Sequence, residues 1–254
     1  MTAIAILLGL AIGVVVGGVG GGGAILALPV LIYVLDQPVG PASTASLVVV
    51  SLAAAIGAGS LARHGRVCWR LAFRFAVPAA LGSLLGTFAS RSVGASALVL
   101  AFVPVMLVAA IATWTRIGDD LDGGCPQPPP ARVVVAGLGV GVLTGFFGVG
   151  GGFVIVPVLT MWLGAPFRRA IATSLVIITL TGLAALASHL IAGSRPNLEV
   201  TAELAVATGL GALLGTVLGE RLPQIVLRRG FAVVVTVLAL ALLLDVLVLG
   251  GPPG

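Results

Sequence analysis

The chain has 254 residues, of which 59% are hydrophobic and 8% are charged, and its mean hydropathy is +1.24. Because soluble domains carry about 25% charged residues, this composition excludes a soluble globular protein and indicates an integral membrane protein. The net charge of +5 comes from arginines that stand singly or in pairs at the ends of apolar segments. This pattern is typical of membrane-topology signals and not of nucleic-acid binding.

The first half of the chain predicts a series of apolar segments, at residues 3–18, 24–35, 42–62, 71–90 and 95–115. Between the first two lies a run in which six of the seven residues from Gly17 to Gly23 are glycine. Glycine loses more conformational freedom on folding than any other residue, so such a run destabilises an ordinary helix. No charged residue occurs between Thr2 and Leu35, which indicates that bare backbone is needed here, deep in apolar surroundings.

A charged, proline-rich segment separates this half from a second series of apolar segments, at 133–147, 153–164, 169–192, 200–219 and 229–249. Proline and charge mark that segment as a linker. The sequence therefore predicts one integral membrane domain with a first membrane repeat at 1–115, a cytoplasmic Pro-rich linker at 116–132 and a second membrane repeat at 133–250.

The second half repeats the first in order and almost without gaps. At an offset of 128 along the chain, Gly13, Gly17, Gly20, Gly22 and Gly23 fall on Gly141, Gly145, Gly148, Gly150 and Gly151, and Pro29, Pro38 and Ser46 fall on Pro157, Pro166 and Ser174. At an offset of 129, Gly82, Gly86 and Thr87 fall on Gly211, Gly215 and Thr216. Ordered matches at a fixed period indicate an internal duplication.

The arginines decide between two topologies. If each glycine run is a kink within one crossing, the arginines divide seven against six between the two faces, which is no bias. If each run is instead a turn, one face keeps only Arg91 and Arg195 and the other collects eleven: Arg63, Arg66, Arg70, Arg74, Arg116, Arg132, Arg168, Arg169, Arg221, Arg228 and Arg229. The second division obeys the positive-inside rule, so both termini are predicted to be extracytoplasmic.

An odd number of crossings in each half makes the two repeats inverted, related by a pseudo-two-fold axis in the membrane plane. The apolar segments after the glycine runs hold about 12 residues, roughly 18 Å of helix, which is too short to cross about 30 Å of hydrocarbon. We therefore expect an all-α polytopic membrane protein with two inverted repeats. Each would hold a Gly-rich broken, re-entrant helical hairpin plus about three transmembrane helices, with the two glycine tips meeting near the centre. Whether each hairpin is re-entrant or crosses twice stays open.

The doubled motif resembles the TauE/SafE-type family of sulfite exporters and organosulfur-anion permeases. In both copies a glycine run is followed by a proline, Pro29 or Pro157, and then by an Ala-(x)3-Ser-Leu motif that begins at Ala42 or Ala170. The resemblance covers nearly the whole chain. It implies a secondary transporter of the bacterial inner membrane for small sulfur-containing anions such as sulfite, thiosulfate or sulfonates. Neither the particular anion nor the direction of transport follows from these motifs.

A small anion in a dry cavity needs hydrogen-bond donors. Backbone N–H groups at helix N-termini supply them, together with about half a positive charge from the helix dipole, and helices beginning near Ala24 and Phe153 would present such ends. Hydroxyl groups after each hairpin would complete the shell. The predicted substrate-binding residues are Gly20, Gly21, Gly22, Gly23, Ser43, Thr44, Ser46, Gly148, Gly150, Gly151, Gly152, Thr173 and Ser174.

Simpler interpretations stand beside this one. Small residues also let helices pack closely, which we favour for the repeated glycines at 82 and 86 and at 211 and 215. Ser46 and Ser174 could equally well bond their own helix backbone. Alternating access also has a competitor, a small-anion channel that uses the same backbone donors. No carboxylate lies at mid-depth in a predicted segment, which disfavours a proton relay through buried carboxylates.

The sequence argues against an enzyme and predicts no cofactor and no metal site. Ser174 and His189 would lie roughly 22 Å apart on one continuous helix, too far for a nucleophile and its base. The only cysteines, Cys68 and Cys125, stand in loops without metal-ligand spacing, and this spacing argues against a zinc site and also against a disulfide. The expected partners are a small anionic substrate and the lipid bilayer, with no nucleic acid. A homodimer remains one assembly that the sequence leaves open.

Overall fold

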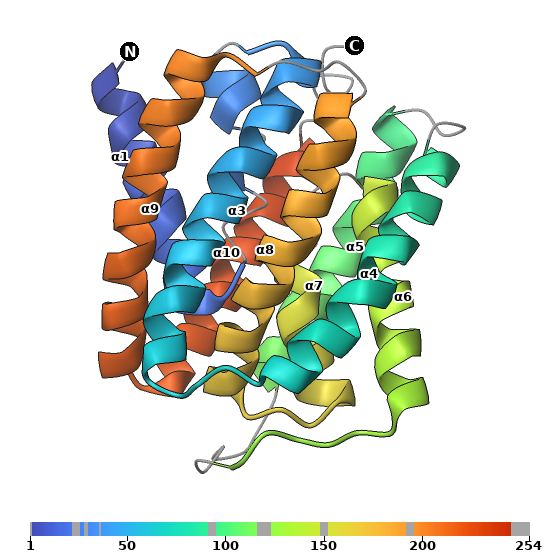
Figure 1. Cartoon of the computed structure of the whole chain (residues 1–254). Coiled ribbons are helices and arrows are strands. Elements are labelled where there is room, and N and C mark those ends of the chain that lie inside the picture. Colours follow the sequence, from blue (N-terminus) through green and yellow to red (C-terminus); the bar gives the residue numbers. More distant parts are fainter. Residues whose placement is uncertain are drawn as a thin grey trace.

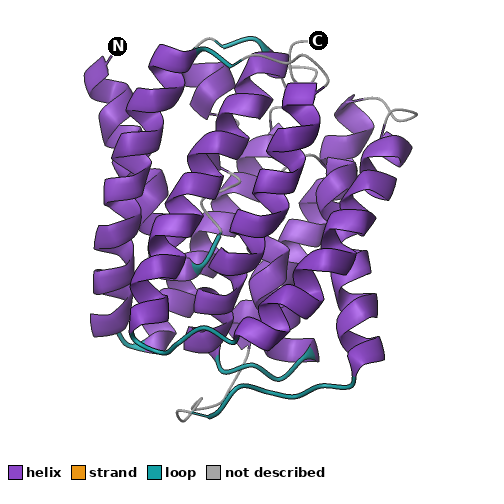
Figure 2. Ribbon diagram, in the orientation of Figure 1, coloured by secondary structure: helices purple, strands orange, loops and turns teal. Residues whose placement is uncertain are grey.

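The computed structural model describes residues 2–21, 26–27, 30–35, 37–90, 95–115, 123–147, 152–191 and 196–244. Within these ranges the chain is helical and contains no strand, which confirms the predicted all-α class (Figure 2). The elements are α1 (Thr2–Val19), η1 (Val30–Val34), α3 (Val39–Arg63), α4 (Trp69–Ser90), α5 (Ala95–Thr115), α6 (Pro130–Phe147), α7 (Gly152–Pro157), η2 (Val158–Trp162), α8 (Phe167–Ile191), α9 (Leu198–Arg221) and α10 (Gln224–Leu244).

The element bounds follow the duplication in the sequence. The starts of α1, η1 and α3 recur as those of α6, η2 and α8 at the offset of 128, and the starts of α4 and α5 recur as those of α9 and α10 at the offset of 129. The short elements η1 and η2 are both π-helical turns, and a proline at the same position of the repeat precedes each of them. The two halves are thus built from the same series of helices.

The two halves are interlocked instead of lying side by side. α1 of the first half packs against α9 of the second, and α6 of the second half packs against α4 of the first. These two pairs form opposite flanks of the bundle in Figure 1, with α3 and α8 in contact between them. The two halves therefore form one membrane body.

Glycines account for the close contact of these flanking helices. A Cβ added at Gly211 of α9 would collide with the Leu10 carbonyl of α1, and one at Gly82 of α4 would collide with the Leu138 carbonyl of α6. The glycines at 86 and 215 face backbone in the same way. This confirms the packing role favoured for these four residues. Since lipid is as apolar as the helices, such close van der Waals contact is the main attraction available between them.

Four helices are long and apolar enough to cross a membrane, judged over the described residues: Pro41–Arg63, Trp69–Ala89, Phe167–Ala187 and Leu198–Arg221. Shorter apolar helices accompany them at Ile4–Val19, Val103–Trp114 and Pro130–Phe146. The centre of the bundle is formed by α8, in which every side chain from Ile171 to Ile178 is buried.

The arginines gather at one end of the bundle, the lower end in Figure 1, which we call the arginine-rich end. The connections between α3 and α4, between η2 and α8 and between α9 and α10 all lie there, with the described part of the linker, residues 123–129. This end holds Arg63, Arg66, Arg70, Arg74, Arg132, Arg168, Arg169, Arg221, Arg228 and Arg229. Arg91, Arg116 and Arg195 lie outside the described residues.

Candidate functional site

Two residues of the first glycine run follow the end of α1 in a backbone conformation that only glycine adopts readily. Gly20 has φ +77° and Gly21 has φ +105°, which are left-handed backbone conformations that a Cβ disfavours. Both amides donate to the Val16 carbonyl, at 2.9 Å and 3.3 Å, and so satisfy an orphan carbonyl at the helix end. The run is therefore divided, because Gly17 still belongs to α1 and packs against Ala212 of α9, whereas Gly20 and Gly21 form the turn.

The turn contacts the second glycine run at the first residue of α7. A Cβ added at Gly21 would lie 2.9 Å from the Cα of Gly152, and one added at Gly152 would lie 2.7 Å from the Gly21 carbonyl oxygen. Carbon atoms that touch without strain are about 3.5–4.0 Å apart, so neither position has room for a side chain. The two runs occupy the same place in the two copies of the repeat, and their described ends, Gly21 and Gly152, are in contact. The tips predicted to meet near the centre lie outside the described residues.

Ser174 of α8 fixes the turn from the other side. Its Oγ lies 2.9 Å from the Gly20 carbonyl oxygen and 2.8 Å from the Ile171 carbonyl oxygen, and the residue is fully buried. One hydroxyl proton serves both carbonyls, so the predicted bond to its own helix and a bond to the first glycine run are both present. In this conformation Ser174 positions backbone, and its proton is not directed at a ligand.

The other predicted hydroxyls also have neighbours in the protein. Ser46 Oγ donates to the Ser43 carbonyl at 2.8 Å, which is the local bond weighed for it in the sequence. Thr173 Oγ1 accepts from the Cys68 backbone N–H at 3.1 Å, and Thr44 is fully buried in α3. Of the glycines predicted to bind substrate, Gly22, Gly23, Gly148, Gly150 and Gly151 lie outside the described residues.

A hydroxyl that the sequence reasoning did not select lies at the contact of the two central helices. Ser51 is the middle residue of α3, and its Oγ is buried without a hydrogen-bond partner among the described residues. It faces Gly182 of α8, where an added Cβ would collide with it. The corresponding residue of the second half, Thr179, donates to the Leu175 carbonyl at 2.8 Å. A buried hydroxyl without a partner is costly, and Ser51 Oγ is such a group among the described residues.

A small pocket of about 20 Å³, the space of one or two water molecules, lies at the arginine-rich end and is lined in part by α1. Its lining includes Gly17, Gly18 and Ile171, and Ile171 also contacts Gly20. The charged residues of the lining are Arg66, Arg168 and Glu220, and the remaining lining residues are Thr216, Gly219, Leu61 and Leu227. The pocket thus brings the arginines close to the last turn of α1, just before the glycine turn.

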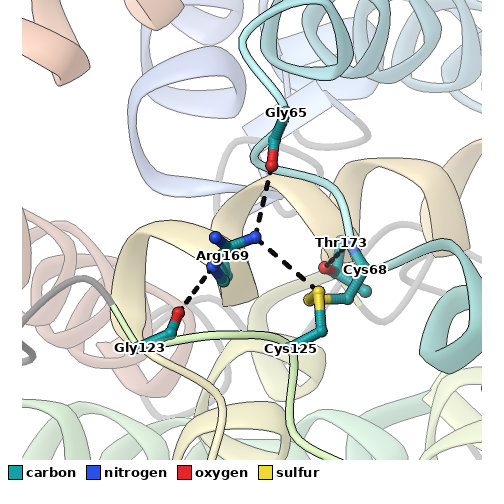
Figure 3. The surroundings of a disulfide bond; sticks show 6 residues. All are labelled: Gly65, Cys68, Gly123, Cys125, Arg169 and Thr173. Atoms are coloured by element: carbon teal, nitrogen blue, oxygen red, sulfur yellow. Dashed lines mark hydrogen bonds between the residues drawn. A yellow bond between two sulfur atoms is a disulfide. The ribbon is translucent and has the colours of Figure 1, made fainter.

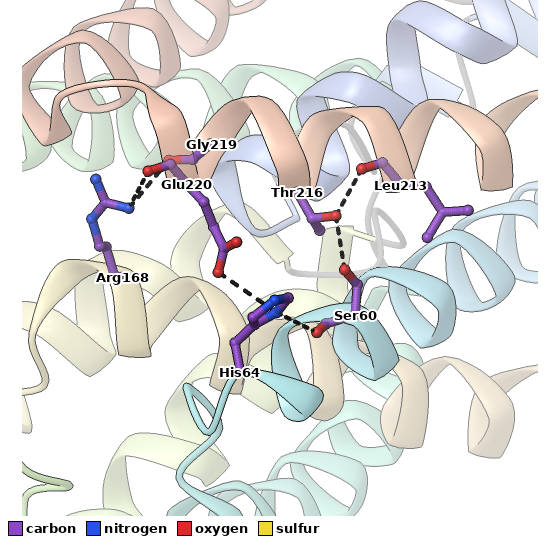
Figure 4. Close-up of polar contacts among 7 residues, drawn as sticks. All are labelled: Ser60, His64, Arg168, Leu213, Thr216, Gly219 and Glu220. Atoms are coloured by element: carbon purple, nitrogen blue, oxygen red, sulfur yellow. Dashed lines mark hydrogen bonds and ion pairs between the residues drawn. The ribbon is translucent and has the colours of Figure 1, made fainter.

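Arg168 lines this pocket while it caps α9. Its Nη1 donates to the Glu220 carbonyl at 3.0 Å (Figure 4). Its Nη2 donates to the Leu222 carbonyl at 3.0 Å. A cation at the C-terminus of a helix is favoured by the helix dipole. The Glu220 carboxylate lies 3.7 Å from His64 Nδ1, and Thr216 Oγ1 lies 3.3 Å from Ser60 Oγ, so polar contacts tie α9 to α3 at the pocket.

The two cysteines form a disulfide, so the prediction that argued against one is wrong. Cys68 and Cys125 are 57 residues apart in sequence but their Cα atoms are 5.6 Å apart, within the usual range for a disulfide. The linker and the α3–α4 loop reach the same end of the bundle, which spacing along the chain does not reveal. Arg169 lies between the linker and the α3–α4 loop (Figure 3). It donates to the Gly65 carbonyl of the loop at 3.2 Å, to the Gly123 carbonyl of the linker at 2.7 Å and to Cys125 Sγ at 3.7 Å.

An apolar bundle of this kind, in which four of the described helices are long and apolar enough to cross a membrane, defines a multi-pass α-helical membrane protein. The chain belongs to the TauE/SafE family, because the family model described as "Sulfite exporter TauE/SafE" matches residues 5–242. This confirms the resemblance read from the doubled glycine motif.

Several relatives are described as probable membrane transporter proteins. One from Xylella fastidiosa strain Temecula1 is 32% identical over 244 residues, covering 90% of both chains. One from Methanocaldococcus jannaschii is 28% identical over 196 residues, covering 75% of this chain and 73% of the relative. YunE from Bacillus subtilis is 25% identical over 243 residues, covering 86% and 89%. No solved structure matches the chain. The family and these descriptions indicate a transporter and not an enzyme.

Proposed function

We propose that this protein is a secondary transporter for small sulfur-containing anions, such as sulfite, thiosulfate or sulfonates including sulfoacetate, in a bacterial inner membrane. The carrying observation is the contact of Gly21 with Gly152 beside a pocket that opens among arginines. Non-helical backbone inside a membrane is tolerated where it is buried in protein or lines a cavity, and broken helices at a repeat interface commonly form substrate sites.

The proposed mechanism is alternating access, in which the halves rock around the paired glycine runs. The chain directions support it, since α1 begins at the end of the bundle where N is marked in Figure 1, whereas its counterpart α6 begins at the opposite end. We interpret this as an inverted repeat. Two runs that approach the centre from opposite sides then let either side open in turn.

Backbone amides of the glycine runs are the proposed anion donors, with a narrower set than the sequence indicated. The amides of Gly20 and Gly21 are used by the Val16 carbonyl. The anion would therefore be held by amides from Gly22 and Gly23 in the first run and from Gly148, Gly150 and Gly151 in the second. Arg66 and Arg168, at the mouth of the pocket, would raise the local concentration of anions.

An enzyme built on Ser174 is not supported. α8 is continuous from Phe167 to Ile191, so the condition that separates Ser174 from His189 by roughly 22 Å holds. The Ser174 hydroxyl also donates to carbonyl oxygens, whereas a nucleophilic serine would have to donate to a base.

The test is transport by purified protein in proteoliposomes. Labelled sulfite or thiosulfate should enter saturably and faster when the vesicles are loaded with unlabelled substrate, because exchange needs only half of the alternating cycle. The alternative small-anion channel predicts no stimulation by the substrate inside. A thermal-shift screen against sulfite, thiosulfate, sulfate, sulfoacetate, taurine and simple carboxylates identifies the ligand class. Stabilisation by carboxylates or cations alone would overturn the sulfur-anion assignment.

A further inference from the structure

We propose that the Cys68–Cys125 disulfide is a thiol-exchange site at which a dithiol reductant releases the mouth of the transport pocket. The proposal rests on the transport function proposed above. It also resolves a conflict at the arginine-rich end, because arginine placement assigns this end to the cytoplasm, where persistent disulfides are rare and those that occur are usually transient or redox-sensing.

The surroundings of the disulfide favour attack on one sulfur. Cys125 is exposed, whereas Cys68 is only 2% exposed. The Arg169 guanidinium lies 3.7 Å from Cys125 Sγ, where it attracts an incoming thiolate. Cys68 immediately precedes α4, and its carbonyl accepts the Ala72 amide at 2.9 Å. A departing Cys68 thiolate would therefore stand at a helix N-terminus, which favours negative charge, and a stabilised leaving thiolate speeds exchange.

The reaction consists of two thiol–disulfide exchanges. A thiolate of the dithiol attacks Cys125 Sγ, the Cys68–Cys125 bond breaks, and Cys68 Sγ leaves with the electron pair of that bond. The second thiol of the reductant then attacks the reductant's other sulfur, which is bonded to Cys125 in the mixed disulfide, and displaces Cys125 as a thiolate. Two electrons and two protons pass to the cysteines, and the dithiol is oxidised to its intramolecular disulfide.

The disulfide belongs to a connection between the two halves of the protein. Cys68 and Gly65 lie in the α3–α4 loop of the first half, whereas Arg169 and Thr173 lie in α8 of the second half (Figure 3). Arg169 holds the Gly65 carbonyl, and Thr173 holds the Cys68 amide. We call these contacts, together with the disulfide, the latch.

The latch is connected to the pocket and to the glycine turn. Arg66 lines the pocket mouth and stands two residues before Cys68. Thr173 is the neighbour of Ser174, whose hydroxyl holds the Gly20 carbonyl at 2.9 Å. Releasing the α3–α4 loop therefore frees Arg66 and loosens the helix turn that fixes the first glycine run. Because the latch joins the halves at one end, the oxidised form restrains opening there and the reduced form transports faster.

The experiment compares oxidised protein with protein reduced by dithiothreitol, using sulfite exchange in proteoliposomes and amide hydrogen exchange of residues 64–68 in detergent. After reduction we expect two cysteines that react with a thiol-labelling reagent and faster amide exchange in this loop. The transport rate should rise about fivefold, which is the change expected when the restraint of one hydrogen bond is lost. Cys125→Ser should transport at the higher rate of the reduced protein, with or without dithiothreitol. Gly124→Ser, an exposed neighbour that keeps the disulfide, should respond as the native chain does.

The two readouts separate the latch from the transport function. Unchanged amide exchange at 64–68 after both thiols are free overturns the latch, and so does a measurable transport rate that reduction leaves unchanged or lowers. Faster amide exchange without transport of any tested sulfur anion in either redox state supports the opening of the loop and overturns the proposed function instead.

Discussion

Replacing Gly21 by alanine tests whether the contact between the glycine runs is needed for transport. Its φ of +105° lies well outside the conformations that a residue with a Cβ adopts, and such a residue costs about 1–3 kcal/mol. The new Cβ would also lie 2.9 Å from the Gly152 Cα, so the two runs would have to separate by about 0.6–1 Å to reach ordinary contact.

The clash with Gly152 arises in the conformation in which the runs touch. A cost of about 1–3 kcal/mol lowers the population of such a state by roughly 5- to 150-fold. A shift of about 1 Å in a binding site can by itself cost a hundredfold in rate. We therefore expect Gly21→Ala to lower the initial rate of sulfite exchange at least tenfold, while the protein still inserts into the membrane in normal amounts.

The assay is uptake of labelled sulfite into proteoliposomes that contain equal amounts of each variant. Gly139→Ala is the matched control, because Gly139 lies in the middle of α6 with no atom within 4 Å of an added Cβ, and alanine favours a helix over glycine. The reasoning is refuted if Gly21→Ala transports within twofold of the native chain, or if both variants lose transport equally.

Three further substitutions test other parts of the structure. Ser174→Ala should lower the unfolding free energy by about 1 kcal/mol and weaken sulfite binding, and unchanged thermal unfolding and binding would remove its positioning role. Gly211→Val should separate α1 from α9 and strongly reduce the folded yield, whereas Gly230→Val, which has open space around it, should not. Gly150→Val should abolish transport and leave membrane insertion intact, and normal transport by this variant would contradict the proposed anion site.

The sequence predicted the helices and their duplication because both depend on local and periodic features. Apolar length and glycine or proline positions recur at offsets of 128 and 129, and the helix starts recur at the same offsets. The packing role of Gly82 and Gly211 was also predictable from the sequence. Each has a second glycine four residues later, and small residues at this spacing on an apolar helix typically allow close helix packing. This periodicity does not reveal which helices pack together. For example, α1 packs against α9, which belongs to the other half.

The candidate site was predicted less completely because its hydroxyls act through distant partners. Ser174 looked like a donor for an anion, but its proton is shared with the Gly20 carbonyl. Gly17 looked like part of the turn but packs within a helix pair. Ser51 gave no signal in the sequence, since its lack of a partner among the described residues depends on how α3 meets α8. Each of these outcomes requires the three-dimensional contact between halves.

The cysteines show most clearly how topology adds to sequence spacing. Their separation of 57 residues carries no disulfide signature, yet the arginine count had already placed the α3–α4 loop and the linker on one face. Two segments confined to one face of a bundle meet far more often than two segments of a free chain, because the membrane removes most of the alternatives. The same count predicts that this face is cytoplasmic, where the disulfides that occur are usually transient or redox-sensing. The exposed Cys125 beside Arg169 is the sulfur at which the proposed exchange would open the bond.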